Sequence, residues 1–202
     1  FEDTVYDFST LESRLREMAF LNKGIKISLE DKRPGSKKKE IFHYEGGLKE
    51  FVAFQNEAKE TIHPDIIYFE ARGKEKNGSD DMECEVAMQY TDRYSELILS
   101  YANNINTTDG GYHLIGFRSA LTRAFNDYAR KNKFIKDTDD SLSGDDVREG
   151  LTAVISVKLT NPQFEGQTKA KLGNSEMRGF VESTTNEYLT AFLQENPNQA
   201  KM

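Results

Sequence analysis

The sequence is poor in cysteine, tryptophan and proline. Its 202 residues include one cysteine, four prolines and no tryptophan. A single cysteine excludes an internal disulfide and fits a reducing, cytoplasmic compartment. Cys84 alternates with Met82, Val86 and Met88 on one face of a predicted strand. We therefore expect Cys84 to be a small buried hydrophobe and not a reactive thiol.

Long apolar runs are also missing. The best run, Leu151–Val157, is far shorter than the roughly 18 residues that a membrane helix needs, and the chain has no signal-like start. A composition of 37% hydrophobic and 30% charged residues predicts a soluble globular protein of one or two domains. Because the chain opens at Phe1 without a methionine, we expect a piece of a longer protein.

Charge and motifs exclude several functions. A net charge of −7 argues against a protein that coats nucleic acid with its whole surface, so any such contact must come from a local patch. The sequence has no Gly-x-Ser-x-Gly elbow, and "GQTKAKLG" lacks the Gly-Lys-[Ser/Thr] ending of a Walker A loop. No metalloprotease or His/Cys metal spacing connects the three histidines, His43, His63 and His113.

An acidic stretch at 137–149 is the best candidate for a metal site, because hard cations bind clustered carboxylates. It lacks the ladder of a calcium loop, however. Asp145 and Asp146 are better explained as first-turn residues that complement the dipole of a short helix, which the stretch from Ser143 to Asp146 caps. The sequence therefore predicts no metal site. We expect His113, which follows two glycines, to be a structural residue near a helix start.

Periodicity predicts two segments with a boundary near residue 56. In the first, Ser9-x-x-Glu12 is a capping box for a helix that Gly24 ends. A hairpin around the basic turn 31–40 and a short helix at 46–56 follow. We assign this segment to residues 1–55.

The second segment, residues 56–202, begins with strands at 65–71, 82–90 and 94–102, which we interpret as an antiparallel meander. A helix is expected at 111–132, with Thr108 or Asp109 as its N-cap. A fully buried strand at 151–159 and a last helix at 174–195 complete the order. The predicted class is α+β, with one sheet and helices packed against a face.

The helix expected at 111–132 carries three arginines. At about 100° per residue, Arg123 and Arg130 lie within about 20° of each other, almost opposite the apolar stripe. Arg118 lies at the edge of that stripe. A solvated helix face is the simpler interpretation, and a surface that contacts a phosphate backbone is the alternative.

A glycine-flanked loop, "PQFEGQTKAKLGN" at 162–174, follows the buried strand. Glycine lets the backbone approach a ligand closely. Gln167 offers an amide fork and Lys169 a mobile cation, a pairing suited to phosphate oxygens. From the residues alone, an ordinary polar loop and a phosphate-binding loop remain equally open.

Two long runs carry a family resemblance, "YHLIGFRSALTRAFNDYA" at 112–129 and "SGDDVREGLTAVISVKLTNPQFEGQTKAKLGNSE" at 143–176. The earlier "RLREMAFLNKGI", "FHYEGG" and "IHPDIIYFE" occur in the matching order. Together they resemble the B subunits of bacterial DNA gyrase, which are type IIA topoisomerases. The resemblance covers essentially the whole chain. It implies the end of a GHKL ATPase domain over 1–55, followed by a transducer domain over 56–202 with a fold like domain 2 of ribosomal protein S5.

The resemblance also implies site residues. In the family, the loop that matches Gln167, Thr168 and Lys169 reaches into the ATPase domain, and its glutamine and lysine bind the γ-phosphate of ATP. Arg118, in "GFR", matches an arginine in the cavity of a dimeric DNA clamp, whereas Arg123 follows more from helix geometry. The implied cofactors are ATP and, in the full-length protein, Mg²⁺. The implied partners are double-stranded DNA, the gyrase A subunit in a heterotetramer, and a second copy of the B subunit itself.

The chain lacks the GHKL elements that hold adenine, Mg²⁺ and the catalytic glutamate, and also the acidic TOPRIM residues. The resemblance therefore implies an ATP-dependent type II topoisomerase as the full-length protein and a regulatory fragment without turnover of its own. A B subunit of topoisomerase IV shares the Gln-Thr-Lys loop and remains an alternative. A stand-alone S5-like RNA-binding module would need a basic, aromatic-studded sheet face. A small hydrolase using the acidic stretch and His113 lacks nucleophile–base spacing.

Overall fold

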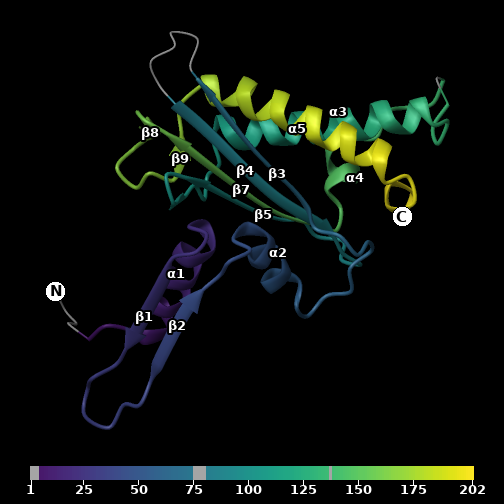
Figure 1. Cartoon of the computed structure of the whole chain (residues 1–202). Coiled ribbons are helices and arrows are strands. Elements are labelled where there is room, and N and C mark those ends of the chain that lie inside the picture. Colours follow the sequence, from purple (N-terminus) through teal and green to yellow (C-terminus); the bar gives the residue numbers. More distant parts are fainter. Residues whose placement is uncertain (1–4, 75–80, 137) are drawn as a thin grey trace.

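A five-stranded mixed sheet forms the centre of the molecule (Figure 1). The computed structural model describes residues 5–74, 81–136 and 138–202. The strand order across the sheet is β3-β4-β7-β5-β6. The bounds are β3 (Ile67–Lys74), β4 (Asp81–Tyr90), β5 (Leu97–Ala102), β6 (Ile105–Asn106) and β7 (Leu151–Leu159).

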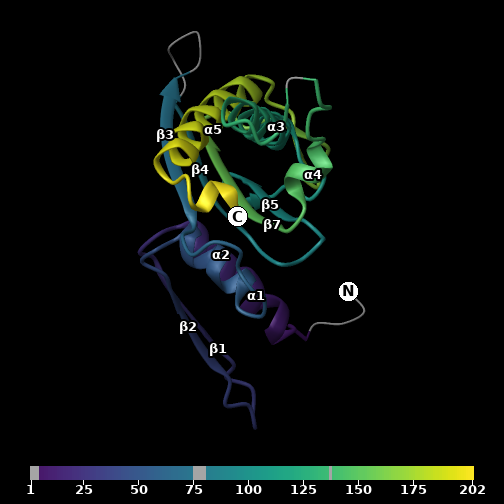
Figure 2. The ribbon, with the colours of Figure 1, turned by 90° about the vertical axis from the view of Figure 1, so that its right-hand side faces the viewer.

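Two long helices, α3 (Tyr112–Lys131) and α5 (Glu176–Glu195), lie side by side over one face of this sheet (Figures 1 and 2). The short α4 (Gly144–Arg148) lies beside α3, and a 3-10 turn, η1 (Gln199–Lys201), follows α5. Phe117 and Leu121 of α3 are fully buried against the sheet, as the apolar stripe predicts. This arrangement confirms the α+β class.

The predicted meander is wrong at its third strand. β3 and β4 pair antiparallel, but β4 then pairs with β7, and β5 pairs parallel with β7 on its other side. Hydrophobic alternation identifies a strand without identifying its neighbour, so β5 was expected beside β4. Parallel partners need a long crossover connection, and here α3 and α4 supply it between β5 and β7.

From Leu151 to Val157, β7 is buried on both faces of the sheet, which explains its largely apolar sequence. Its odd-numbered side chains, such as Ile155 and Val157, pack in the core under α3 and α5. On the other face, Val154 packs under α2 (Leu48–Asn56). Central strands covered on both faces read as continuous hydrophobic runs, and the predicted fully buried strand is confirmed.

The N-terminal segment packs on the second face of the sheet. It contains α1 (Phe8–Leu21), a hairpin of β1 (Lys26–Glu30) and β2 (Lys39–His43), and α2. Phe20 of α1 stacks on Phe51 of α2 at 4.7 Å between ring centroids, and both join a core with Tyr101 of the sheet. The predicted arrangement, in which helices cover one face of the sheet, therefore holds only for residues 56–202. In the whole chain α2 covers part of the opposite face.

Two predicted caps are wrong and one is confirmed. Asp7, not Ser9, caps α1, because its carboxylate accepts the Thr10 backbone N–H at 2.9 Å. Gly111 occupies the N-cap position of α3 in place of Thr108 or Asp109. The capping box between Ser143 and Asp146 forms as expected.

Cys84 lies in the core, and burial raises the pKa of its thiol to about 12, so the expected apolar role is confirmed. No helix in the described part of the chain is long and apolar enough to cross a membrane. The connection between the predicted strands at 65–71 and 82–90 includes residues 75–80, which lie outside the described residues, as does Asp137 of the acidic stretch.

Candidate functional site

The Gln-Thr-Lys loop forms the tip of a small hairpin between β8 (Phe164–Glu165) and β9 (Lys171–Leu172). Gln167, Thr168 and Lys169 are all exposed. The Lys169 ammonium lies 5.8 Å from the centroid of the Phe164 ring. Within the described residues, neither the Lys169 side chain nor the Gln167 side chain has an ion pair or hydrogen bond. The tip therefore presents an amide and a cation to solvent.

The backbone of this tip is unusual. Gly166 has a φ of 77°, and a Cβ there would meet no atom within 4 Å. Lys169 also has a positive φ, 55°, a left-handed conformation that is uncommon for residues other than glycine. Such a conformation costs on the order of 1–3 kcal/mol and concentrates at functional sites. The sequence pattern contains no indication of this feature.

The base of the hairpin is fixed to the start of α3. The Leu172 backbone N–H donates to the Gly110 carbonyl at 3.0 Å, and the Asp109 N–H donates to the Ala170 carbonyl at 2.9 Å. A Cβ on Gly111 would lie 2.4 Å from the Leu172 carbonyl oxygen, so only glycine fits this approach. An exposed tip thus extends from a base locked to the first residues of α3.

A buried amide secures the other side of the base. Asn174, almost fully buried, accepts the Gln163 backbone N–H at 2.6 Å. Its amide group donates to the Asn161 carbonyl at 3.2 Å and to the Glu176 carboxylate at 2.6 Å. These bonds join the exit of β7 to the start of α5, so the base of the hairpin contacts both long helices.

His113 completes the anchor of α3. Its Nε2 lies 3.1 Å from Thr107 Oγ1, and the ring is fully buried. Burial lowers the pKa of His113 to about 4, so the ring is neutral at pH 7. The predicted structural role near a helix start is confirmed.

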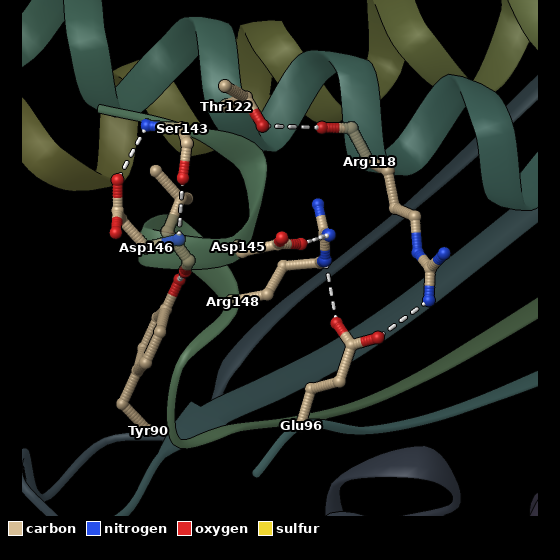
Figure 3. Close-up of polar contacts among 9 residues, drawn as sticks. Tyr90, Glu96, Arg118, Thr122, Ser143, Asp145, Asp146 and Arg148 are labelled. Atoms are coloured by element: carbon tan, nitrogen blue, oxygen red, sulfur yellow. Dashed lines mark hydrogen bonds and ion pairs between the residues drawn. The ribbon is translucent and has the colours of Figure 1, made fainter. Parts of the chain in front are cut away.

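Arg118 belongs to a chain of four charges (Figure 3). Its Nη2 lies 2.8 Å from Glu96 Oε1, and the other oxygen of Glu96 lies 2.6 Å from Arg148 Nε. Arg148 Nη2 in turn lies 2.6 Å from Asp145 Oδ1. Arg118, predicted to contact DNA, is thus already paired within its own chain.

Arg123 and Arg130 differ from each other more than the helix geometry predicts. Arg123 has a side chain 66% exposed and lies 3.8 Å from Asp127, one turn further along α3. Arg130 donates to the Lys136 and Asp139 carbonyls and to a serine hydroxyl, so it holds the loop after α3. Of this pair only Arg123 remains a solvated cation.

The acidic stretch forms no metal centre in the part that the structure describes. Groups of three or more carboxylate, histidine or cysteine side chains with metal-binding geometry are absent among the described residues. Asp145 is paired with Arg148, and Asp146 closes the capping box. These contacts explain both carboxylates without a cation.

Fold and site together define an α+β module. Its hairpin is hydrogen-bonded at the base to the start of α3 and presents the Lys169 ammonium and the Gln167 amide to solvent. The adjacent helix α3 carries three arginines. Such a module can contact phosphate groups through its exposed ammonium and amide. Two of the solved structures that are similar to the chain are ATPase or ATP-binding domains of bacterial topoisomerases. The 43K ATPase domain of Thermus thermophilus gyrase B, in complex with an aminocoumarin, has a TM-score of 0.81 and 40% identity over the whole chain and 52% of that structure. The topoisomerase IV ATP binding domain of Francisella tularensis, in complex with a small-molecule inhibitor, has a TM-score of 0.78 and 29% identity, with the same coverage.

The chain belongs to the DNA gyrase B family, whose model matches residues 47–202. It is 57% identical to the DNA gyrase B protein of Clostridium acetobutylicum over its whole length and 53% identical to that of Enterococcus faecalis over 99% of its length. It spans only 31% and 30% of those two proteins. The resemblance inferred from the motifs is therefore confirmed.

Sequence reasoning missed the residues that support the predicted site. Glu96 and Arg148 lie 52 positions apart, and Asn174 lies at the end of an otherwise polar loop. No local pattern could pair Glu96 with two arginines. The Gly110-Gly111 pair before a helix was a usable signal, because consecutive glycines indicate a close backbone approach.

Proposed function

We propose that the chain is the ATP-sensing transducer part of a DNA gyrase B protein. Residues 56–202 form the transducer, with a fold like domain 2 of ribosomal protein S5, and residues 1–55 are the last elements of a GHKL ATPase domain. The transducer couples ATP binding and hydrolysis to closure of a DNA clamp and strand passage, and hence to DNA supercoiling. Membership of the gyrase B family supports this assignment.

The unpaired hairpin tip is the observation that carries the proposal. The side chains of Lys169 and Gln167 extend from a hydrogen-bonded base and have no polar partners among the described residues. Lys169 keeps a strained backbone conformation, which is retained where a side chain must be aimed. A γ-phosphate supplies the missing partner, because its oxygens accept bonds from both an ammonium and an amide.

A continuous path leads from this tip to the basic helix. The hairpin base is bonded to Gly110 and packs on Gly111, the N-cap of α3. Arg118 lies six residues beyond Tyr112, about 9 Å further along the helix. α3 and α5 share an extensive contact, so a shift of the hairpin moves both helices together. Release of the γ-phosphate after hydrolysis is thereby transmitted to the DNA-facing helix.

The remaining roles follow from the family. Arg118 and Arg123 contact the backbone of double-stranded DNA inside a dimeric clamp. The full-length cytoplasmic protein binds ATP with Mg²⁺, dimerises through its ATPase domain and joins the gyrase A protein in a heterotetramer. In this chain the cofactor contact is limited to the γ-phosphate, through Gln167, Thr168 and Lys169.

A gyrase protein is favoured over a topoisomerase IV protein. The matching family model is that of DNA gyrase B, and the two curated relatives at 57% and 53% identity are DNA gyrase B subunits. A stand-alone RNA-binding module is disfavoured by the sheet face that α3 and α5 do not cover. That face carries Glu70, Glu83 and Glu85 beside Arg72 and Lys158, so it is not the basic platform that RNA requires.

Hydrogen exchange on the full-length protein tests the proposal directly. A non-hydrolysable ATP analogue should slow exchange of the amides at 164–172 by at least tenfold, whereas ADP should not, because ADP lacks the γ-phosphate. Amides in the middle of α5 serve as the internal control. Equal protection by ADP would contradict γ-phosphate sensing.

The 202-residue chain itself should neither hydrolyse ATP nor bind it tightly, because the adenine pocket and catalytic base lie elsewhere. Calorimetry on the chain should detect no binding in the micromolar range. Reconstituted with the gyrase A protein, the full-length protein should supercoil relaxed circular DNA only when ATP is present. Micromolar ATP affinity of the chain alone would contradict the proposal that the adenine pocket lies outside these 202 residues.

A further inference from the structure

The ion pair between Arg118 and Glu96 raises a question that the proposed function leaves open. A guanidinium already neutralised by a carboxylate is a poor ligand for phosphate unless the carboxylate can be given up. Four charged side chains form a row in which the sign alternates, Arg118–Glu96–Arg148–Asp145, and their charges sum to zero (Figure 3). They come from three places: α3, the segment before β5, and α4.

The two arginines hold Glu96 unequally. The Arg148 side chain is 15% exposed and lies 2.6 Å from each of two carboxylates. The Arg118 side chain is 40% exposed and has one carboxylate partner, at 2.8 Å. If Arg118 turns away, Glu96 keeps Arg148 through its other oxygen, and no charge is left buried and unpaired, which is the arrangement that proteins avoid.

Arg118 is also incompletely satisfied where it lies. Its Nε is buried and has no hydrogen-bond partner among the described residues. A buried donor without an acceptor costs free energy. A guanidinium can use two of its N–H groups on one phosphate in a fork-like geometry. A phosphate group can therefore accept two hydrogen bonds from Arg118, whereas Glu96 accepts one.

We propose that Glu96 is a positioning residue that holds Arg118 in an exchangeable ion pair. When DNA binds, a backbone phosphate oxygen replaces the Glu96 carboxylate on Arg118, and Glu96 remains paired with Arg148. This inference rests on the proposed DNA contact of Arg118 and adds a restraint to it. Before DNA arrives, Glu96 lowers the apparent affinity of α3 for phosphate and ties α3 to α4.

The test compares two isosteric, charge-matched substitutions in the full-length protein assembled with gyrase A. Glu96→Gln removes the competing charge on Arg118 but keeps an oxygen for Arg148. Asp127→Asn removes one charge near Arg123, whose contact is longer and exposed. Linear duplex DNA is the probe, and the DNA concentration that half-maximally stimulates ATP turnover is measured.

Glu96→Gln should lower that DNA concentration about two- to fivefold, the range expected for releasing one partly exposed ion pair. Asp127→Asn should change it less. In the Arg118→Ala background the effect of Glu96→Gln should vanish, because the two substitutions act through one contact. A purely structural role of Glu96 would lower the melting temperature without tightening DNA binding.

Three outcomes are distinguishable. Weaker DNA response for Arg118→Ala together with tighter, Arg118-dependent response for Glu96→Gln supports the exchange. Weaker response for Arg118→Ala with no tightening for Glu96→Gln overturns the exchange and leaves the proposed DNA contact standing. An unchanged DNA response for Arg118→Ala overturns the DNA contact itself, and the exchange with it.

Discussion

The hairpin tip at Gln167–Lys169 and the middle of α3 both present cations that we propose to meet phosphate, but their surroundings are opposite. The Lys169 ammonium has no polar partner within the described residues, and the Lys169 backbone is strained. Arg118 lies in a regular helix and is paired with Glu96. A residue that completes a site on another domain needs no internal partner, because its ligand arrives with that domain. A residue that waits for DNA must instead be held and then released.

Substitution at the contact between the hairpin base and the start of α3 should cost more stability than the other substitutions considered below. Gly111→Ala would place a Cβ 2.4 Å from the Leu172 carbonyl at a φ of 139°. Strain and overpacking together should cost about 3–5 kcal/mol. Urea unfolding of the 202-residue chain measures the loss.

Gly179→Ala is the matched control, because a Cβ there meets nothing within 4 Å. In the interior of α5 it should be neutral or stabilise the chain by up to about 1 kcal/mol. Equal stability of the two variants would show that the hairpin base is not locked to α3.

Lys169→Ala should reduce ATP turnover of the full-length protein on the order of 10²-fold, the scale for losing one preorganised charge-stabilising group. The ammonium is exposed, so the chain should unfold at an unchanged temperature, and ADP affinity should stay the same. Gln167→Ala should act in the same direction but only about tenfold, because a neutral amide forms the weaker bond.

Lys171→Ala is the control within the same hairpin. Its ammonium lies 3.1 Å from Glu165, so it already has a partner and should change turnover by less than about twofold. If Lys169→Ala behaves like Lys171→Ala, the Gln-Thr-Lys tip is an ordinary polar loop.

Burial of the His113 ring at the start of α3 should make the free energy of unfolding depend on pH. The pKa of His113 falls from 6.5 to about 4 on folding, so between these values the unfolded chain binds more protons. Stability is therefore full above pH 6.5 and decreases as the pH falls toward 4. Between pH 7.5 and 5 the loss should be about 2 kcal/mol.

Urea unfolding at the two pH values measures this loss, and an NMR titration of the His113 ring assigns it. The lowered pKa of His63 acts in the same direction. A flat stability profile over this range, or a His113 ring that titrates near 6.5, would contradict the buried anchor.

Charge removal on α3 should have the smallest effect, visible only with DNA. Arg118→Ala and Arg123→Ala should each lower the salt slope of DNA binding by about one unit. DNA-stimulated turnover should fall more than basal turnover. Arg72→Ala removes an exposed cation on the opposite sheet face and serves as the control. If all three variants respond alike, the α3 arginines are solvated residues without a DNA contact.

Much of the site could be predicted from the sequence because its signals are local. Gln167 and Lys169 lie between glycines directly after a buried strand, and the family motif implies the phosphate-binding roles that we propose for them. The spacing of Phe117 and Leu121 identified α3 and its buried face. Cys84 was assigned to the core by alternation alone. Each of these depends on residues within a few positions of one another.

Other features depended on neighbours that are distant in sequence. The position of β7 between β4 and β5 depends on backbone hydrogen bonds made after a crossover of about fifty residues, and hydrophobic alternation carries no record of the partner. Helix geometry grouped Arg123 with Arg130, but Arg130 instead binds loop carbonyls.

The sequence by itself determined the long helices, the longer strands, the family and the loop that we propose to meet ATP, because periodicity and motifs depend on residues that are close together in the chain. Tertiary structure alone decided that the Lys169 ammonium has no ion pair among the described residues, whereas Arg118 is paired with Glu96. Free rotation of a long side chain makes its partner a matter of which charges lie within reach in space. The partner of Arg118 is therefore fixed only when β5, α3 and α4 pack together.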